Sequence, residues 1–205
     1  MRRLRVAWIS AVLALGLVAT ACGGGGNPLV VAELFALFSA NAASADPRIS
    51  MDPGPAAGEV FSVEINASGV TDLYGAAFTV LYDPLSATFL GCDSQGSVLV
   101  VGGAPSNPCD DSLVGGAKFS AALENGVEGV LNVRASLDGV VPGLPVGTGL
   151  LLTLTFEAIG TISVPEPFDF EVGPSRDVEA CPQDLSPCNT VGAAFDGGTL
   201  VTSGG

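Results

Sequence analysis

The feature that most constrains the fold of this sequence is a series of short stretches in which apolar and polar residues alternate one by one. In EVFSVEINA, for example, Phe61, Val63 and Ile65 fall on the same side of an extended chain. Glycine- and proline-rich turns separate these stretches, and helical periodicity is nearly absent. Strands with one apolar face form antiparallel sheets that stack on each other. The sequence therefore predicts an all-β, antiparallel two-sheet β-sandwich.

The pattern predicts about nine strands within residues 48–205, which we interpret as one domain. The expected strands are Ile49–Met51, Glu59–Ala67, Asp72–Tyr82, Ala87–Gly91, Lys118–Glu124, Val130–Leu137, Leu150–Ala158, Phe168–Val172 and Ala194–Val201, the last with a bulge or turn at Gly197-Gly198. The connections Gly91–Gly116 and Ser175–Gly192 are expected to be long loops.

The first 21 residues have the composition of a secretory signal. Three arginines are followed by an apolar run from Val6 to Val18, which is shorter than a membrane span, and then by Ala19-Thr20-Ala21-Cys22. This order resembles the signal of a bacterial lipoprotein, and the resemblance implies that Cys22 carries the lipid. The alternative is an ordinary cleaved signal with an incidental cysteine. We expect an exported protein that is lipid-anchored to the bacterial cell envelope, at the outer membrane or the cell surface.

Residues 22–47 would then connect the lipid to the domain. Gly23–Gly26 form a flexible tether, and the alanine-rich segment NPLVVAELFALFSANAASA follows it. We expect this lead segment to be disordered or loosely packed. The alternative is a helix lying on the lipid surface, but the segment lacks the basic face of such helices.

Charge and composition exclude several classes of function. The chain has 7 basic residues, 21 acidic residues and no histidine. Removal of the signal would leave four basic residues and a net charge of roughly −17, which excludes nucleic-acid binding and disfavours electrostatic binding to anionic lipid. Without histidine there can be no Ser-His or Cys-His catalytic pair. Asp83 precedes Pro84 at a strand end, where aspartate commonly caps a turn. We therefore expect no enzymatic activity and no catalytic residues.

Four cysteines remain after Cys22, and an even number in an exported chain indicates disulfides. Three pairings are possible. We favour Cys92–Cys109 and Cys181–Cys188, because each pair brackets a loop-like stretch. A metal site is disfavoured by the absence of histidine and of C-x-x-C spacing.

No cofactor is expected, although calcium is an open alternative. Hard oxygen ligands occur in the two long connections, at Asp110 and Asp111 and at Asp177, Glu179 and Asp184. Their spacing is not that of an EF-hand. The simpler interpretation is that these acids are solvated.

The order of several segments resembles that of cohesin domains. The segments are AGEVFSVEINASGV, DLYGAAFTVLYDP and ATFLG, followed by GVLNVRASLDG, GTGLLLTLTFEAIG and GGTLVT, and they span most of Arg48 to Thr202. The resemblance implies a nine-stranded jelly-roll sandwich that binds dockerin modules through one flat sheet face. The wider superfamily includes cellulose-binding modules, so a carbohydrate- or polysaccharide-binding module is the alternative. A structural envelope lipoprotein without a specific ligand is a third possibility.

By analogy with cohesins, the binding face would use the strands around Asp72–Tyr82, Lys118–Glu124, Val130–Leu137 and Phe168–Val172. With the apolar side turned inward, Tyr74 and Tyr82 should point into the core with Phe78. The residues expected on the outer side are Thr79, Leu81, Lys118, Ser120, Asn132, Arg134, Ser136, Asp169 and Glu171. They form either a protein-binding face or an ordinary solvated sheet surface. Sugar binding is less favoured, because the only tryptophan, Trp8, lies in the signal.

Overall fold

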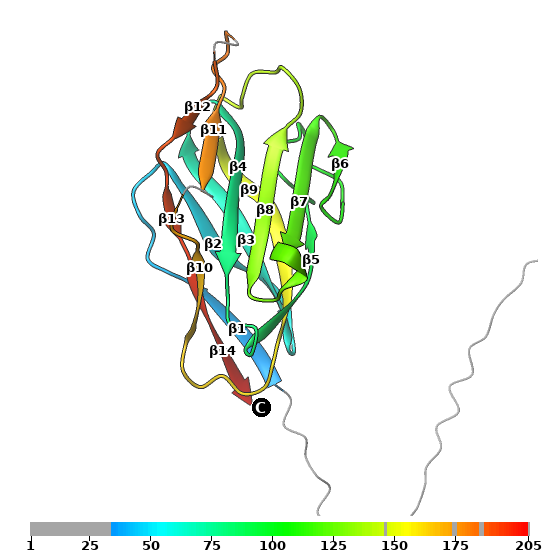
Figure 1. Ribbon diagram of the computed structural model, residues 1–205, viewed down its shortest axis with the longest axis vertical. Helices are drawn as coiled ribbons and strands as arrows, with labels where there is room; N and C mark the ends of the chain where they lie inside the picture. The colour runs from blue at the N-terminus through cyan, green and yellow to red at the C-terminus, as the bar shows by residue number, and fades with distance from the viewer. Residues whose placement is uncertain (1–33, 146, 174–175, 185–186, 205) are drawn as a thin grey trace, which may run out of the picture. The chain divides into compact units, whose positions relative to one another are not determined.

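A computed structural model describes residues 34–145, 147–173, 176–184 and 187–204. The described chain forms two β-sheets stacked as a sandwich (Figure 1), so the predicted all-β sandwich is confirmed. The strands are β1 (Leu34–Ala40), β2 (Arg48–Ala57), β3 (Val60–Val70), β4 (Leu73–Leu81), β5 (Ala87–Asp93), β6 (Asp110–Val114), β7 (Ala117–Leu123), β8 (Val130–Leu137), β9 (Gly147–Ala158), β10 (Glu166–Phe170), β11 (Asp177–Ala180), β12 (Asn189–Val191), β13 (Ala194–Asp196) and β14 (Gly198–Gly204), with a short 3-10 helix, η1, at Glu124–Gly126.

The larger sheet has nine strands and the smaller has five. The larger sheet runs β1-β14-β10-β4-β8-β7-β6, and β11 and β12 join it beside β4. The smaller sheet runs β13-β2-β3-β9-β5. All strand pairs are antiparallel except β13 with β2, which is parallel. The side of β4 opposite β8 is shared, because β10 pairs with its end near Leu81 and β11 with its beginning.

All nine predicted strands are present, and the last of them is divided. The stretch Ala194–Val201 splits at Gly197 into β13 and β14, which belong to different sheets. A Cβ atom at Gly197 would lie 2.3 Å from the carbonyl oxygen of Phe168, so only glycine fits where the chain changes sheet. The predicted bulge or turn at this position is therefore a crossing between the two layers.

The prediction that the lead segment is disordered or loosely packed is wrong over Leu34–Ala40, because these residues form β1. This strand pairs with β14 over its whole length, from Leu34 opposite Gly204 to Ala40 opposite Gly198. Its inward residues Ala36 and Phe38 are only 6% and 4% exposed. The alternation was hidden in the sequence because the outward residues Phe35 and Leu37 are also apolar.

A cluster of aromatic rings fills the space between the sheets. Phe61 of β3 and Phe156 of β9 come from the smaller sheet, and Phe168 of β10 comes from the larger one; each is at most 1% exposed. Their ring centroids lie 5.2–5.8 Å apart. Phe38 of β1 adds a further edge-on contact to Phe168 at 5.6 Å. These contacts bind the two layers into one core.

The two long connections are partly strands rather than loops. The first contains β6, and the second contains β11 and β12. The disulfides Cys92–Cys109 and Cys181–Cys188 are both present, which confirms the favoured pairing. No helix within the described residues has the length and apolar character needed to cross a membrane. The predicted signal, Cys22 and the glycine tether lie outside the described residues.

Candidate binding face

The outward surface of β4, β8 and β7 consists of three aligned rows of side chains. Strand pairing places Gly75, Ser136 and Lys118 in one row, with Ala77, Arg134 and Ser120 in the next, and Thr79, Asn132 and Ala122 in the third. The alternating inward residues, such as Phe78 and Val133, are buried. We call this surface, together with Leu81, Asp169 and Glu171, the outer face; its strands β4, β8 and β7 lie side by side in Figure 1.

All nine residues predicted for the binding face lie on this surface. Asp169 pairs with Leu81, and the backbone N–H of Glu171 donates to the carbonyl oxygen of Thr79. The side chains at Asn132, Arg134 and Asp169 are exposed, and those at Leu81, Lys118, Ser120 and Glu171 are partly exposed. Whether a partner uses these residues stays a prediction.

Two of the nine residues lie in the floor of the face rather than projecting from it. Thr79 is only 2% exposed, and its hydroxyl donates a hydrogen bond of 2.9 Å to Oδ1 of Asn132. Ser136 is 4% exposed and lies against Gly75. A Cβ atom added to Gly75 would lie 2.7 Å from the Cβ atom of Ser136. The floor is therefore low and tightly packed.

Arg134 stands between two shallow hollows in this floor. One hollow, of about 230 Å³, is lined by Gly75, Ala77, Ser136, Asp177 and Glu179 as well as by Arg134. The other, of about 240 Å³, is lined by Ala77, Thr79, Ser120 and Asn132 together with Arg134. Within the described part of the chain, the guanidinium of Arg134 makes no hydrogen bond or ion pair. Its five N–H donors are available to a ligand.

Charged residues on and beside the outer face differ in how they are paired. Lys118 forms an ion pair of 3.0 Å with Asp138, which directly follows β8, and the hydrogen bond in this pair raises the pKa of Lys118. Asp177 and Glu179 lie on β11, opposite Ala77 and Gly75 of β4. These two acids were not among the residues that the sequence pattern predicted for the face. The alternation of DVEA was the available signal, but four residues are too few to show which strand they pair with.

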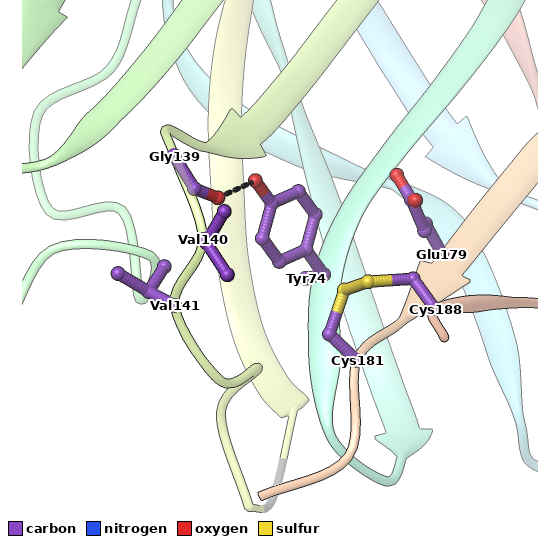
Figure 2. A pocket seen from close by; sticks show the side chains of 7 residues that line it. All are labelled: Tyr74, Gly139, Val140, Val141, Glu179, Cys181 and Cys188. Carbon is purple, nitrogen blue, oxygen red and sulfur yellow. Dashed lines mark hydrogen bonds between the residues drawn. A yellow bond between two sulfur atoms is a disulfide. The ribbon is translucent and has the colours of Figure 1, made fainter. Parts of the chain in front are cut away.

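The prediction that Tyr74 points into the core is wrong. Between Glu179 and Ala180 the register against β4 shifts by one residue, so that Leu73 lies opposite Ala180 and Gly75 opposite Glu179. The bulge turns Leu73 inward, where it is fully buried, and leaves Tyr74 half-buried at the rim. The Tyr74 hydroxyl donates to the carbonyl oxygen of Gly139 at 2.6 Å (Figure 2). Burial, and then the charges of Glu179 and Asp138, raise the pKa of Tyr74.

The predicted core position of Tyr82 is confirmed. Tyr82 is 6% exposed, and its ring stacks on Phe168 at 5.6 Å. Its hydroxyl donates to the carboxylate of Glu128. Burial, followed by this hydrogen bond, raises the pKa of Tyr82. The hydroxyl is therefore held protonated in a structural contact.

Comparison with known proteins was informative only at the level of three-dimensional structure. A scan against known protein families finds no match, and a search of curated proteins finds none. Among solved structures, the second type II cohesin module of the ScaA scaffoldin of Acetivibrio cellulolyticus matches with a TM-score of 0.52 and 15% identity, over 75% of this chain and 87% of that chain. Type II cohesin A11 of Bacteroides cellulosolvens matches with a TM-score of 0.51 and 16% identity, over 75% of this chain and 96% of that chain.

The chain has the cohesin fold. A type II cohesin–X–dockerin complex of Acetivibrio cellulolyticus also matches, with a TM-score of 0.51 and 15% identity, over 72% of this chain and 93% of that chain. The likeness confirms the jelly-roll sandwich implied by the sequence resemblance. At these identities it concerns the fold alone.

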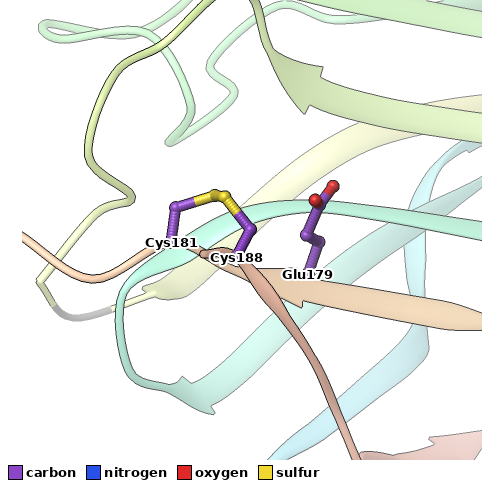
Figure 3. Close-up of side chains that lie close together, drawn as sticks. All are labelled: Glu179, Cys181 and Cys188. Carbon is purple, nitrogen blue, oxygen red and sulfur yellow. A yellow bond between two sulfur atoms is a disulfide. The ribbon is translucent and has the colours of Figure 1, made fainter. Parts of the chain in front are cut away.

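In this cohesin fold, the acids considered for calcium lie at two separate places. Asp110 and Asp111 are on β6, whereas Asp177 and Glu179 are on β11, and Asp184 follows β11. Glu179 also lies beside Cys181 and Cys188, and the ligand-type atoms of these three residues are within 4.8 Å of one another (Figure 3). The two sulfur atoms are bonded to each other, so they are not thiolates that could bind a metal.

Asp83 has the structural role expected of it. One carboxylate oxygen accepts the backbone N–H of Leu85 at 2.9 Å, and the other accepts the hydroxyl of Ser86 at 3.2 Å. These bonds cap the turn that connects β4 to β5.

Proposed function

We propose that this protein is a non-catalytic binding module of the bacterial cell envelope, and that it holds a protein partner noncovalently through its outer face. The observation that carries the proposal is Arg134. In a strongly acidic domain, a guanidinium with no hydrogen bond or ion pair among the described residues stands at the centre of a flat, small-residue surface with a hollow on each side. Arginines in such settings are frequent energetic centres of protein interfaces.

The low floor of the outer face supports a protein partner. Gly75, Ala77, Thr79 and Ser136 leave the backbone of β4 and β8 close to the surface, so an approaching element meets few projecting side chains. Leu81 adds a partly exposed apolar residue at one end. A partner that placed a carboxylate on Arg134 and an apolar side chain on Leu81 would match both groups.

A protein ligand is favoured over a polysaccharide. Sugar-binding sandwiches use exposed aromatic rings, which combine an apolar face with low conformational freedom. Among the described residues, Phe35 is the exposed phenylalanine, and it lies on β1 rather than on β4, β7 or β8. Tyr74 of β4 is half-buried at the rim with its hydroxyl bonded to Gly139, and the other aromatic side chains of the described strands pack mainly in the core.

A dockerin-type module is the first partner to test, because a solved structure with this fold comes from a cohesin–X–dockerin complex. The predicted lipid on Cys22 would attach the domain, and hence its partner, to the cell envelope. Membrane attachment through the lipid alone agrees with the acidity of the chain.

The test is to measure binding of the purified protein to a panel of dockerin modules and to insoluble cellulose, chitin and xylan. The same protein, immobilised, is used to capture proteins from an envelope extract of its source organism. Wild type is compared throughout with the double variant Leu81→Asp/Arg134→Glu and with a control, Glu64→Lys, on the smaller sheet.

We expect a protein partner that binds wild type and the control but not the double variant. Retention on polysaccharide that survives the double substitution would replace the proposal with a carbohydrate-binding function. Equal capture of the same proteins by wild type and the double variant would exclude the outer face.

A further inference from the structure

A third hollow lies at the rim of the outer face, beside Tyr74. We call it the rim hollow. Its volume is about 150 Å³, and it is lined by Tyr74, Val140, Val141, Glu179 and the Cys181–Cys188 disulfide (Figure 2). The tyrosine ring stands between the Gly139–Val141 loop and the disulfide. Of the described residues that line the hollow, only Glu179 is charged.

The walls of the rim hollow are held together by hydrogen bonds and by the disulfide. The N–H of Gly143 donates to the carbonyl oxygen of Cys181 at 2.8 Å. The N–H of Cys181 donates to the backbone carbonyl oxygen of Asp72 at 2.9 Å. The side-chain amide of Gln183 donates to the carbonyl oxygen of Gly143 at 2.7 Å and to the carboxylate of Asp72 at 3.1 Å. These bonds link the loop after β8, the start of β4 and the residues Cys181 and Gln183 to one another.

The size and chemistry of the rim hollow suit an aliphatic or aromatic side chain. An apolar cavity of roughly 150 Å³ holds a molecule as large as benzene. The tyrosine hydroxyl is already occupied by Gly139, so the ring presents its carbon atoms to the space. Val140 is 87% exposed and Val141 is 38% exposed. A side chain entering from a partner would cover this apolar surface.

The rim hollow borders the outer face at Glu179. Glu179 lines the rim hollow on one side and the hollow beside Arg134 on the other. Asp177, two residues away on the same strand, lines the Arg134 hollow as well. A ligand that fills the rim hollow therefore meets a negative rim on the side facing Arg134.

We propose that the rim hollow receives an aliphatic side chain of the protein partner, and that a lysine or arginine next to that side chain pairs with Glu179. The inference rests on the proposed function, because it names a second anchor of the same partner. The partner would therefore place an acidic group on Arg134, and an aliphatic side chain with a neighbouring basic residue at the rim hollow.

Acetylated dipeptide amides test the rim hollow without the partner. The probe is N-acetyl-leucyl-lysine amide, titrated into the purified isotope-labelled protein and followed by backbone amide NMR. We expect shifts confined to the residues around Tyr74, Val140 and Glu179, with a dissociation constant on the order of 1 mM. Replacing leucine by alanine in the probe should weaken binding about tenfold. Replacing lysine by glutamate should weaken it about threefold, and this difference should shrink in high salt.

Matched variants assign the binding to the hollow. Val140→Asp should abolish the shifts, whereas Val101→Asp, at a valine that is 95% exposed in another loop, should leave them unchanged. Glu179→Gln should remove the preference for lysine over glutamate. Equal binding of the leucine and alanine probes, or shifts that survive Val140→Asp, would overturn the proposal. Dipeptide binding here together with absent partner binding at Arg134 would refute the proposed function and leave the rim hollow intact as a site.

Discussion

Both outward surfaces carry polar side chains that hydrogen-bond to one another, and the two surfaces differ at Arg134. On the smaller sheet, Asp52 accepts hydrogen bonds from Ser50 at 2.9 Å and from Asn66 at 3.0 Å, and the hydroxyls of Ser62 and Thr155 lie 3.4 Å apart. On the larger sheet, Arg134 has no partner among the described residues, and hollows flank it.

This difference separates a solvated surface from one suited to a ligand. Side chains that already bond to each other have little to gain from a partner, whereas an unpaired guanidinium over a low floor can gain charge-assisted hydrogen bonds. Both surfaces arise from strands in which apolar and polar residues alternate. The two surfaces differ because strand pairing brings different side chains next to one another.

The largest expected effect is on the free energy of unfolding, through the core that lies between the two surfaces. Phe38→Ala should lower the free energy of unfolding by about 3 kcal/mol, because the ring is buried against Phe61 and Phe168. Leu37→Ala, on the exposed side of the same strand, should change it by less than about 0.5 kcal/mol. Urea unfolding measures both. Similar small losses for the two variants would mean that β1 is not part of the sandwich.

The two disulfides should differ in what they stabilise. Cys92 lies in β5 of the smaller sheet and Cys109 immediately precedes β6 of the larger one, so their bond joins the edges of the two sheets across 17 residues. Cys181 and Cys188 are only 7 residues apart. Replacing the first pair by serine should cost about 3 kcal/mol and the second about 2 kcal/mol. Thermal unfolding of both double variants checks this order, and a larger loss for the second pair would reverse it.

Substitution on the two outward surfaces should affect binding unequally. Arg134→Glu should weaken partner binding about thirtyfold, or about 2 kcal/mol, through the loss of an anchor and the addition of a like charge. Glu64→Lys on the smaller sheet should change affinity less than about twofold. Calorimetric titration measures both, with circular dichroism to show that each variant is folded. Equal effects would remove the distinction between the surfaces.

The smallest expected effect is the pH dependence of stability that comes from Asp93, the last residue of β5, which binds the loop after this strand. Burial alone would raise the pKa of Asp93, but hydrogen bonds from Ser106, Gln95 and Asn107 outweigh it and hold the pKa below its ordinary value. The carboxylate therefore stabilises the fold above its unfolded pKa of about 3.9, and this stabilisation is lost as the pH falls through the lower folded value.

Asp93→Asn should accordingly destabilise the protein by less than about 1 kcal/mol at pH 7, because solvent screens this partly exposed site, and by less still at pH 3. Unfolding of both proteins at the two pH values gives the comparison. A difference that grows on acidification would contradict the assigned sign.

Local pattern predicted the strands of the core and the side of the sheet on which residues such as Phe78 and Asn132 lie. Phe61, Val63 and Ile65 are buried on one side as expected, because alternation in a strand needs no knowledge of its neighbours. The nine residues of the predicted binding face share one surface for the same reason. The pattern did not predict features that depend on which strands pair. The strand β1 was missed because it is apolar on both sides, and the outward position of Tyr74 was missed because it follows from a bulge in the pairing of β4 with β11. The hollows beside Arg134 likewise depend on which strand lies next to β4.

The most direct test of the central claim is hydrogen exchange, measured by mass spectrometry on the free protein and on its complex with the tightest-binding protein partner. The outer face predicts added protection in peptides of β4, β7 and β8, centred on Arg134, and unchanged exchange in β3 and β9. Added protection in β3 and β9, with β4, β7 and β8 unchanged, would show that the partner binds the other surface and would contradict the account.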